Sequence, residues 1–152
     1  MKKIFLLLLP ALLMFSCSDP CKDVVCENYG NCIDGACECQ IGYEGTSCET
    51  HIFTAYSGVY TGTYIEDGVS FSNHSTDLFP VAGVSVRVEI GNFSADFYSN
   101  TAFRIPNQAF TANGEYVTVN SGQGTCDGSS LSFEVEFRAD GMTHSASFTG
   151  TK

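Results

Sequence analysis

Two hydrophobic patterns divide the chain. Residues 4–15 form an almost wholly apolar run that is broken only by Pro10. From about Phe53 onward, apolar and polar residues instead alternate. Clear examples are Val84, Val86, Val88 and Ile90, then Val117 and Val119, then Phe133, Val135 and Phe137, and finally Ala146 and Phe148. A period of two puts successive side chains on opposite faces of a β-strand, so this part is predicted to form strands with one apolar and one polar face.

Turn dipeptides separate the alternating segments. They are Asp67-Gly68, Gly91-Asn92, Asn113-Gly114, Asp127-Gly128 and Asp140-Gly141. Such pairs adopt positive φ readily and favour two-residue hairpins, which predicts a meander of about eight antiparallel strands. A meander of this size closes into a small barrel or folds into a sandwich. Residues 73–80 are predicted to form a longer loop, Gly122-Gln123-Gly124 a turn-like or bulge-like segment, and no stretch shows a convincing helical period.

The apolar run near the N-terminus is typical of a signal peptide. It follows Lys2 and Lys3 and is shorter than the roughly 20 residues that span a membrane. Ser16-Cys17 then resembles the lipobox of bacterial lipoproteins, although Met14 and Phe15 depart from its usual residues. The resemblance implies cleavage after residue 16, a lipid on Cys17, a lipidated tether at residues 17–20 and a membrane partner. The alternative is an ordinary secreted protein with a spare cysteine.

The net charge of the chain limits the classes of partner that it can bind. The formal net charge is −10, and it falls to −12 once Lys2 and Lys3 leave with the signal peptide. A surface of this sign repels phosphate backbones, so no nucleic-acid partner is expected.

Asp19 lies one place beyond the usual position for inner-membrane retention, so the lipoprotein resemblance favours the outer membrane within the cell envelope. Whether the periplasmic or the surface face carries the protein stays open.

Six of the eight cysteines lie close together, in the pattern C-x4-C-x5-C-x4-C-x-C-x8-C. Six cysteines allow 15 pairings. The spacing, together with the ending from Gly42 to Cys48, is similar to that of the EGF-like family, which implies an EGF-like module at residues 21–49. The family pairing implies the disulfides Cys21–Cys32, Cys26–Cys37 and Cys39–Cys48. A zinc site fits less well, because Cys37-Glu38-Cys39 is CxC rather than CxxC. No calcium is expected, because Ser18-Asp19-Pro20 replaces the acidic run of calcium-binding modules.

The remaining residues, 52–152, are assigned to the barrel or sandwich domain, so the whole fold is predicted to be all-β. The segment near its start, Gly58–Tyr64, and the segment at its end, Phe148–Thr151, resemble those of the small lipocalin-like barrels of bacterial lipoproteins. Many aromatic residues occur in this domain, and most are expected in its core. Some could line a cavity or form an exposed binding patch.

Candidate catalytic residues are few. His51, His74 and His144 are scattered, Glu134 and Glu136 lie on the polar face of a predicted strand, and no G-x-S-x-G motif is present. We therefore expect no enzyme activity, no metal and no cofactor. Cys126 is interpreted as a buried free thiol, with a reactive thiol or an intermolecular disulfide as the alternative.

Two functions fit these observations. The first is a non-enzymatic interaction or adhesion module of the cell envelope, whose partner is a protein or a glycan. The second is a lipocalin-like carrier of a small apolar ligand. The interior of the barrel distinguishes the two functions. A filled interior favours the interaction module, and an open apolar cavity of about 300 Å³ or more favours the carrier.

Overall fold

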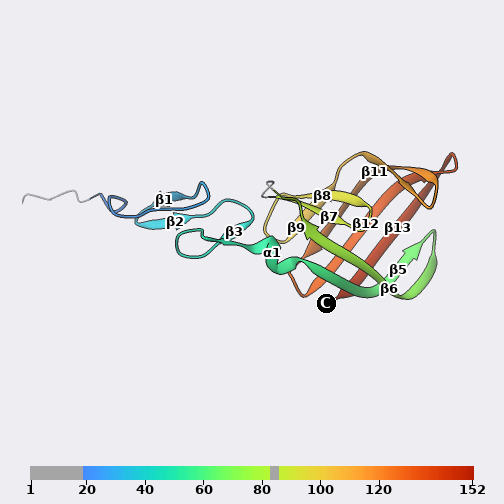
Figure 1. Cartoon of the computed structure of the whole chain (residues 1–152), viewed down its shortest axis with the longest axis horizontal. Coiled ribbons are helices and arrows are strands. Elements are labelled where there is room, and N and C mark those ends of the chain that lie inside the picture. The colour runs from blue at the N-terminus through green and yellow to red at the C-terminus, as the bar shows by residue number, and fades with distance from the viewer. Residues whose placement is uncertain (1–18, 83–85) are drawn as a thin grey trace, which may run out of the picture.

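The computed structural model describes residues 19–82 and 86–152 (Figure 1). The signal peptide expected at residues 1–16, Cys17 and Val84 lie outside these residues. The described chain forms a small disulfide-rich segment followed by an antiparallel β-barrel. The predicted all-β class is therefore confirmed, and of the two architectures left open the barrel is the one observed.

The disulfide-rich segment consists of two short hairpin-like pairs. They are β1 (Asn31–Ile33) with β2 (Ala36–Glu38), and β3 (Tyr43–Glu44) with β4 (Thr50–His51). The disulfides are Cys21–Cys32, Cys26–Cys37 and Cys39–Cys48, the same pairs that the family resemblance implies. Val25 and Ile33 stay 78% and 53% exposed, so this segment has little apolar core. The disulfides must supply most of its stability, at about 2–3 kcal/mol for each loop of this length.

The barrel is an up-and-down meander. Its strands are β5 (Gly58–Glu66), β6 (Val69–Pro80), β7 (Arg87–Ile90), β8 (Phe93–Phe97), β9 (Ala102–Ile105), β10 (Gln108–Ala112), β11 (Glu115–Cys126), β12 (Ser130–Ala139) and β13 (Met142–Thr151). Their order is β10-β11-β12-β13-β5-β6-β7-β8-β9, and β9 pairs again with β11, which closes the ring. Both β9 and β10 pair with β11 and are separated at Pro106, so together they act as one interrupted strand. Counted in this way, the described strands form an eight-stranded closed barrel.

The turn dipeptides all connect neighbouring antiparallel strands, as predicted. Positive φ occurs at both residues of Asp67-Gly68, Asn113-Gly114 and Asp140-Gly141, and at the glycine of Gly91-Asn92 and of Asp127-Gly128. These backbone conformations match the twist of the flanking strands. The local sequence therefore sets the positions at which the meander reverses.

Two elements differ from the prediction. Residues 73–80 are not a loop but the second half of β6, which pairs with β5. Most side chains of β6 are exposed on both faces, so its sequence lacks the alternation that identifies a half-buried strand. The described residues also include a helix, α1 (Ile52–Tyr56), which at five residues is too short to show a helical period.

The glycine-rich segment Gly122-Gln123-Gly124 is also not a turn. It lies inside β11, and the register shift in this strand occurs just before it, between Val119 and Ser121. A Cβ atom at Gly124 would overlap the ring of Phe103. Glycine at this position therefore leaves space for Phe103 to pack inside the barrel.

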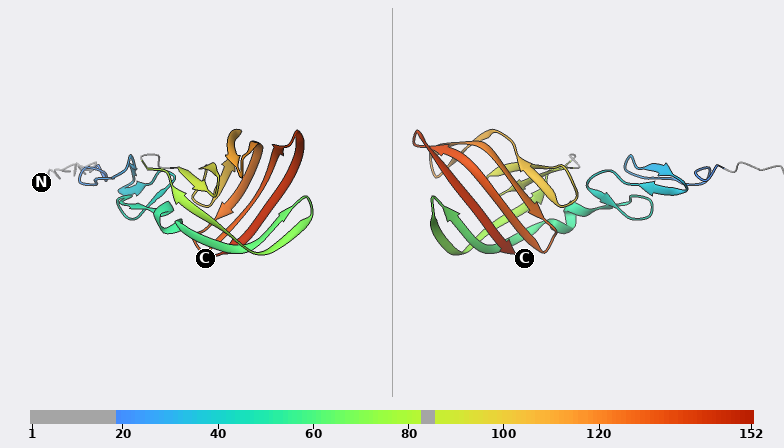
Figure 2. Two further views of the ribbon diagram at one scale, coloured as in Figure 1. Left: turned by 45° about the vertical axis from the view of Figure 1, so that its right-hand side comes forward. Right: turned by 180° about the vertical axis from the view of Figure 1, so that it is seen from behind.

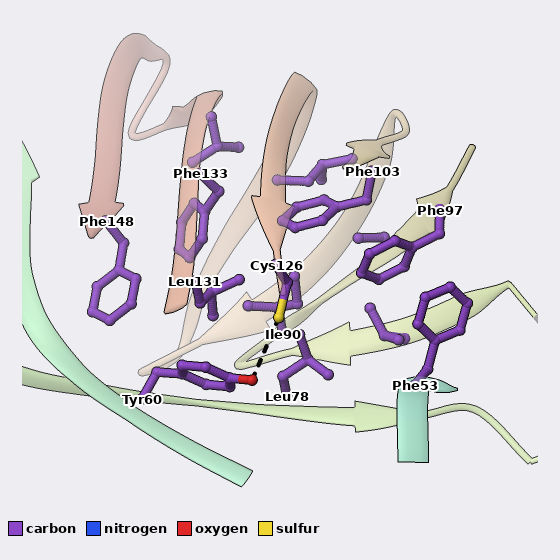
Figure 3. Packing of buried hydrophobic residues seen from close by; sticks show 14 of the residues in the cluster. Phe53, Tyr60, Leu78, Ile90, Phe97, Phe103, Cys126, Leu131, Phe133 and Phe148 are labelled. Atoms are coloured by element: carbon purple, nitrogen blue, oxygen red, sulfur yellow. Dashed lines mark hydrogen bonds between the residues drawn. The ribbon is translucent and has the colours of Figure 1, made fainter. Parts of the chain in front are cut away.

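The two ends of the barrel are built differently. The tight turns at residues 67–68, 91–92, 113–114 and 140–141 lie at one end, which we call the mouth. The opposite end is closed by α1, and we call it the plugged end. Phe53 of α1 is fully buried, and its ring stacks on Phe97 with centroids 4.1 Å apart (Figure 3). Aromatic burial of this kind contributes strongly to stability.

The disulfide-rich segment contacts the plugged end. The Gly42 N–H donates to Oδ1 of Asn100 at 3.1 Å, and the Tyr56 hydroxyl donates to the Asn100 carbonyl at 3.0 Å. The Ile52 N–H also donates to the Gly42 carbonyl at 3.0 Å. In Figure 2 the disulfide-rich segment extends from this end, while the β5–β6 and β12–β13 turns lie far from it. Within residues 19–82 and 86–152, no helix has the length and apolar character needed to cross a bilayer.

Candidate functional site

The mouth of the barrel opens into a cavity of about 790 Å³, which we call the cup. Side chains from most of the barrel strands surround it. Its lining comprises Tyr64, Glu66, His74, Ser75, Thr76, Asp77, Ile90, Gly91, Asn92, Phe93, Phe110, Ala112, Asn113, Glu115, Val117, Val119, Phe133, Val135, Phe137, Ala139, Asp140 and His144. The volume lies within the range of about 300–1,000 Å³ that is typical of small-molecule sites.

The cup has an apolar floor because the strands alternate as predicted. On β12, Phe133 and Val135 are 7% and 9% exposed, and Phe137 is half-buried nearer the mouth. Val119 of β11 and Ile90 of β7 are almost fully buried beside them. Below this floor the barrel is filled by the side chains of the plugged end (Figure 3). The barrel is therefore neither solid throughout nor hollow throughout.

The wall of the cup is lower at β7 and β8 than at the neighbouring β6. Strand β7 pairs only with Leu78–Pro80 of β6, so most of the β5–β6 hairpin extends beyond β7 toward the mouth. The Gly91 N–H donates to the Asp77 carbonyl at 3.0 Å, where the β7–β8 turn meets β6. The cup is thus open both at the mouth and along this part of β6.

Aromatic rings form a continuous wall inside the cup. The rings of Tyr64 and His74 stack with centroids 4.8 Å apart, and His74 meets Phe148 edge-on at 6.2 Å. Phe148 stacks on Phe133 at 5.5 Å, and Phe133 contacts Phe93 in a T-shaped pair at 5.4 Å. Such a wall offers ring faces and edges to an apolar or planar ligand.

Polar groups occupy the rim of the cup. His144 Nδ1 lies 2.6 Å from Asp67 Oδ2, and the His144 ring stacks on Phe137 at 5.3 Å. The hydrogen bond with Asp67 raises the pKa of His144. The pKa of Asp67 is lowered, first by the Ser145 N–H that donates to it at 3.0 Å and then by His144. This pair fastens the β5–β6 turn to β13.

A second polar pair lies where the aromatic wall meets the rim. The Tyr64 hydroxyl donates to Oε2 of Glu66 at 3.1 Å. Burial, followed by the nearby Glu66 carboxylate, raises the pKa of Tyr64 well above its ordinary value. The phenol therefore stays neutral and acts as a hydrogen-bond donor at any physiological pH.

The sequence-predicted residues do not form one site. His51 stacks edge-on between Tyr43 and Phe53 at the joint with the disulfide-rich segment, whereas His74 and His144 line the cup. Glu134 and Glu136 lie on the outer surface, where they accept hydrogen bonds from Gln123 and Asn120. Among the described residues, no group of three His, Cys, Asp or Glu side chains is arranged to hold a metal ion.

Cys126 lies in the plugged end and not in the cup. Its side chain is 1% exposed and its sulfur lies 3.4 Å from the Tyr60 hydroxyl (Figure 3). The Tyr60 hydroxyl donates to the Tyr56 carbonyl at 2.6 Å, which links this pair to α1. Burial raises the pKa of the Cys126 thiol. Among the described residues, Cys126 is buried and forms no disulfide.

Two shallower hollows lie on the outer face of the barrel over β11, β12 and β13, with volumes of about 490 and 430 Å³. Ser, Thr, Gln and Glu side chains surround them, with Tyr98 at one edge. They lack the aromatic wall of the cup and are open to water, so they are weaker candidates for ligand binding.

Sequence reasoning missed most of the polar residues of the cup. Glu66, Glu115 and Asp140 each lie in or beside a tight turn, and Asp77 lies in the segment mistaken for a loop. The turn dipeptides were a usable signal, because alternate turns of an up-and-down barrel lie at the same end. Residues that flank those turns therefore meet at the mouth.

Comparison of the chain with protein families, with curated proteins and with solved structures finds no match. The geometry of the cup therefore carries the functional argument. An apolar floor, an aromatic wall and a polar rim can hold a small molecule by burying its apolar part and binding its polar end.

Proposed function

We propose that this protein is a non-enzymatic lipoprotein of the cell envelope that holds a small ligand with an apolar body in its cup. The observation that carries the proposal is the cup itself, a cavity of about 790 Å³ with an apolar floor and a polar rim. A barrel that served only as a rigid adhesion unit would gain stability by filling this space with side chains. The lipocalin-like resemblance of residues 52–152 points in the same direction.

The N-terminal part supplies the attachment in this proposal. A lipid on Cys17 would anchor the chain to a bilayer, and the EGF-like resemblance of residues 21–49 suggests a spacer between the anchor and the barrel. The contacts of Gly42 with Asn100 and with Ile52 of α1 hold this spacer against the plugged end. The mouth then faces away from the anchor, where a ligand can enter from solvent.

An interaction module for a protein or a glycan is the second candidate. Exposed apolar side chains flank the turns of the mouth: Phe71 is 48%, Met142 62% and Tyr116 70% exposed. Exposed residues of this kind are common at binding surfaces. In this case the rim of the cup, rather than its interior, would make the contact.

A fluorescence titration of the full chain with N-phenyl-1-naphthylamine tests the carrier. This uncharged probe becomes fluorescent when it enters an apolar site. Ala112→Trp places a large ring in the cup, whereas Ala109→Trp makes the same change on the exposed face of the same strand. We expect saturable binding that Ala112→Trp weakens at least about tenfold, consistent with the loss of apolar contact area, and that Ala109→Trp leaves unchanged.

The melting temperatures of both variants serve as the folding control. Equal probe binding by Ala112→Trp and Ala109→Trp would locate the probe outside the cup and refute the carrier. No saturable binding by the unaltered chain would refute it as well, and would leave the exposed rim as the surface to investigate.

A further inference from the structure

We infer that the cup selects ligands in which a positively charged group adjoins an apolar body, such as an alkyl or aryl amine. This inference rests on the proposed function and adds the class of ligand. It follows from how charge and aromatic surface are distributed in the lining.

The lining carries more acidic than basic side chains. Glu66, Glu115 and Asp140 belong to the lining, which includes no lysine or arginine among its described members. The only ion pairs of the described chain are Arg87–Asp96, outside the cup, and His144–Asp67, beside its rim. The cup is therefore a region of negative potential, which attracts cations and repels anions.

The aromatic wall suits the same ligand. Ring faces attract a cation that lies within about 6 Å of the ring centre. The Tyr64 hydroxyl holds the Glu66 carboxylate at 3.1 Å, so a negative charge lies next to the first ring of the wall. A cation placed beside this pair would meet the Glu66 carboxylate and the aromatic surface together, while its apolar part lies along Phe133 and Val135.

An inorganic cation fits less well. No trio of His, Cys, Asp or Glu side chains in the described residues has the arrangement that a metal ion needs. The carboxylates of the cup are spread over β5, β11 and the β12–β13 turn. A large organic cation with diffuse charge can interact with several of them without direct coordination.

A competition experiment with matched head groups tests the inference. Octyltrimethylammonium, octyl sulfate and octanol share one tail, and each is used to displace N-phenyl-1-naphthylamine from the full chain. At low salt we expect the ammonium compound to compete roughly tenfold more strongly than the sulfate, with octanol between them, and the difference to shrink as salt screens the carboxylates. Equal or stronger competition by octyl sulfate overturns the inference while leaving the carrier intact. Absence of probe binding overturns both.

Charge variants locate the effect in the cup. Glu115→Gln combined with Asp140→Asn removes two lining charges, and Asp34→Asn combined with Glu89→Gln removes two charges elsewhere. The first pair should weaken the binding of octyltrimethylammonium roughly three- to tenfold without changing the binding of octanol. The control pair should change the binding of neither compound by more than about twofold. An equal loss for octanol, or an equal effect of the control pair, overturns the inference.

Discussion

The side-chain amide of Gln108 forms two hydrogen bonds with the backbone of Ser94. The Ser94 N–H donates to Oε1, and Nε2 donates to the Ser94 carbonyl, both at 2.7 Å. Strand β9 ends just before Pro106, so at Ser94 strand β8 pairs with β7 but has no backbone partner on its other side. The amide therefore takes the place of a paired residue and joins β8 to β10 beside the cup.

Replacing Gln108 by leucine should weaken the barrel at this point. Both Ser94 backbone groups lose their partner in a partly buried setting, which should lower the free energy of unfolding by about 1–3 kcal/mol. Urea denaturation measures this loss, and hydrogen exchange should show faster exchange of the Ser94 amide. The control is Gln123→Leu. The Gln123 amide donates to the exposed Glu134, so its loss should lower the free energy of unfolding by about 0.5 kcal/mol or less. Equal effects of the two variants would contradict the assigned role of Gln108.

Phe53 should be among the most sensitive positions of the chain. It is fully buried and stacks on Phe97. Phe53→Ala should therefore lower the free energy of unfolding by about 3–5 kcal/mol, because it leaves a cavity at the plugged end. Phe79→Ala, at a site that is 47% exposed, should cost about 1 kcal/mol or less. Thermal unfolding of the two variants compares them directly. A small effect at Phe53 would mean that α1 does not plug the barrel.

The His144–Asp67 pair should make stability depend on pH. The raised pKa of His144 means that its contribution is complete below about pH 6.5 and is lost as pH rises through its folded-state pKa. The lowered pKa of Asp67 means that its contribution is complete above about pH 4 and is lost as pH falls. The pair therefore stabilises the β5–β6 turn most between about pH 4 and pH 6.5.

The measurement is the melting temperature of the unaltered chain and of His144→Gln across this range. The unaltered chain should melt higher than the variant near pH 5–6, and the difference should shrink toward about pH 8–9, where histidine is neutral. A difference that stays constant with pH would show that His144 acts through packing on Phe137 alone.

The Cys126 thiol should be unreactive while the chain is folded. It is 1% exposed and burial raises its pKa, so little thiolate is available to a disulfide reagent. In a Cys17→Ser background, the reaction with dithiobis(nitrobenzoate) should be slow in buffer and rapid in denaturant, and its rate should follow global unfolding. Rapid reaction in buffer would instead point to local opening of the plugged end.

Much of the fold was predictable because it is set locally. The alternation at Phe133, Val135 and Phe137 gives the apolar face, and pairs such as Asn113-Gly114 give the turns. Residues 73–80 escaped prediction because a strand with two exposed faces has no periodic pattern. The helix α1 escaped because five residues are too few to show one.

The candidate site was much less predictable. The cup depends on closure between β9 and β11, which no local pattern specifies. Asp67 and His144 lie 77 residues apart in sequence, and only the pairing of β13 with β5 brings them together. Gln108 replaces backbone pairing with a side-chain amide, and a single glutamine carries no sign of that role in the sequence.

The division between the plugged end and the mouth separates two kinds of selective constraint. Substitutions at Phe53, Phe97 or Cys126 affect stability, whereas the residues beside the tight turns contribute little to the core and shape the cup. Related chains should therefore tolerate wide variation around the mouth while keeping the same scaffold. A barrel of this kind can acquire a new ligand preference through a few changes near its turns, without losing its ability to fold.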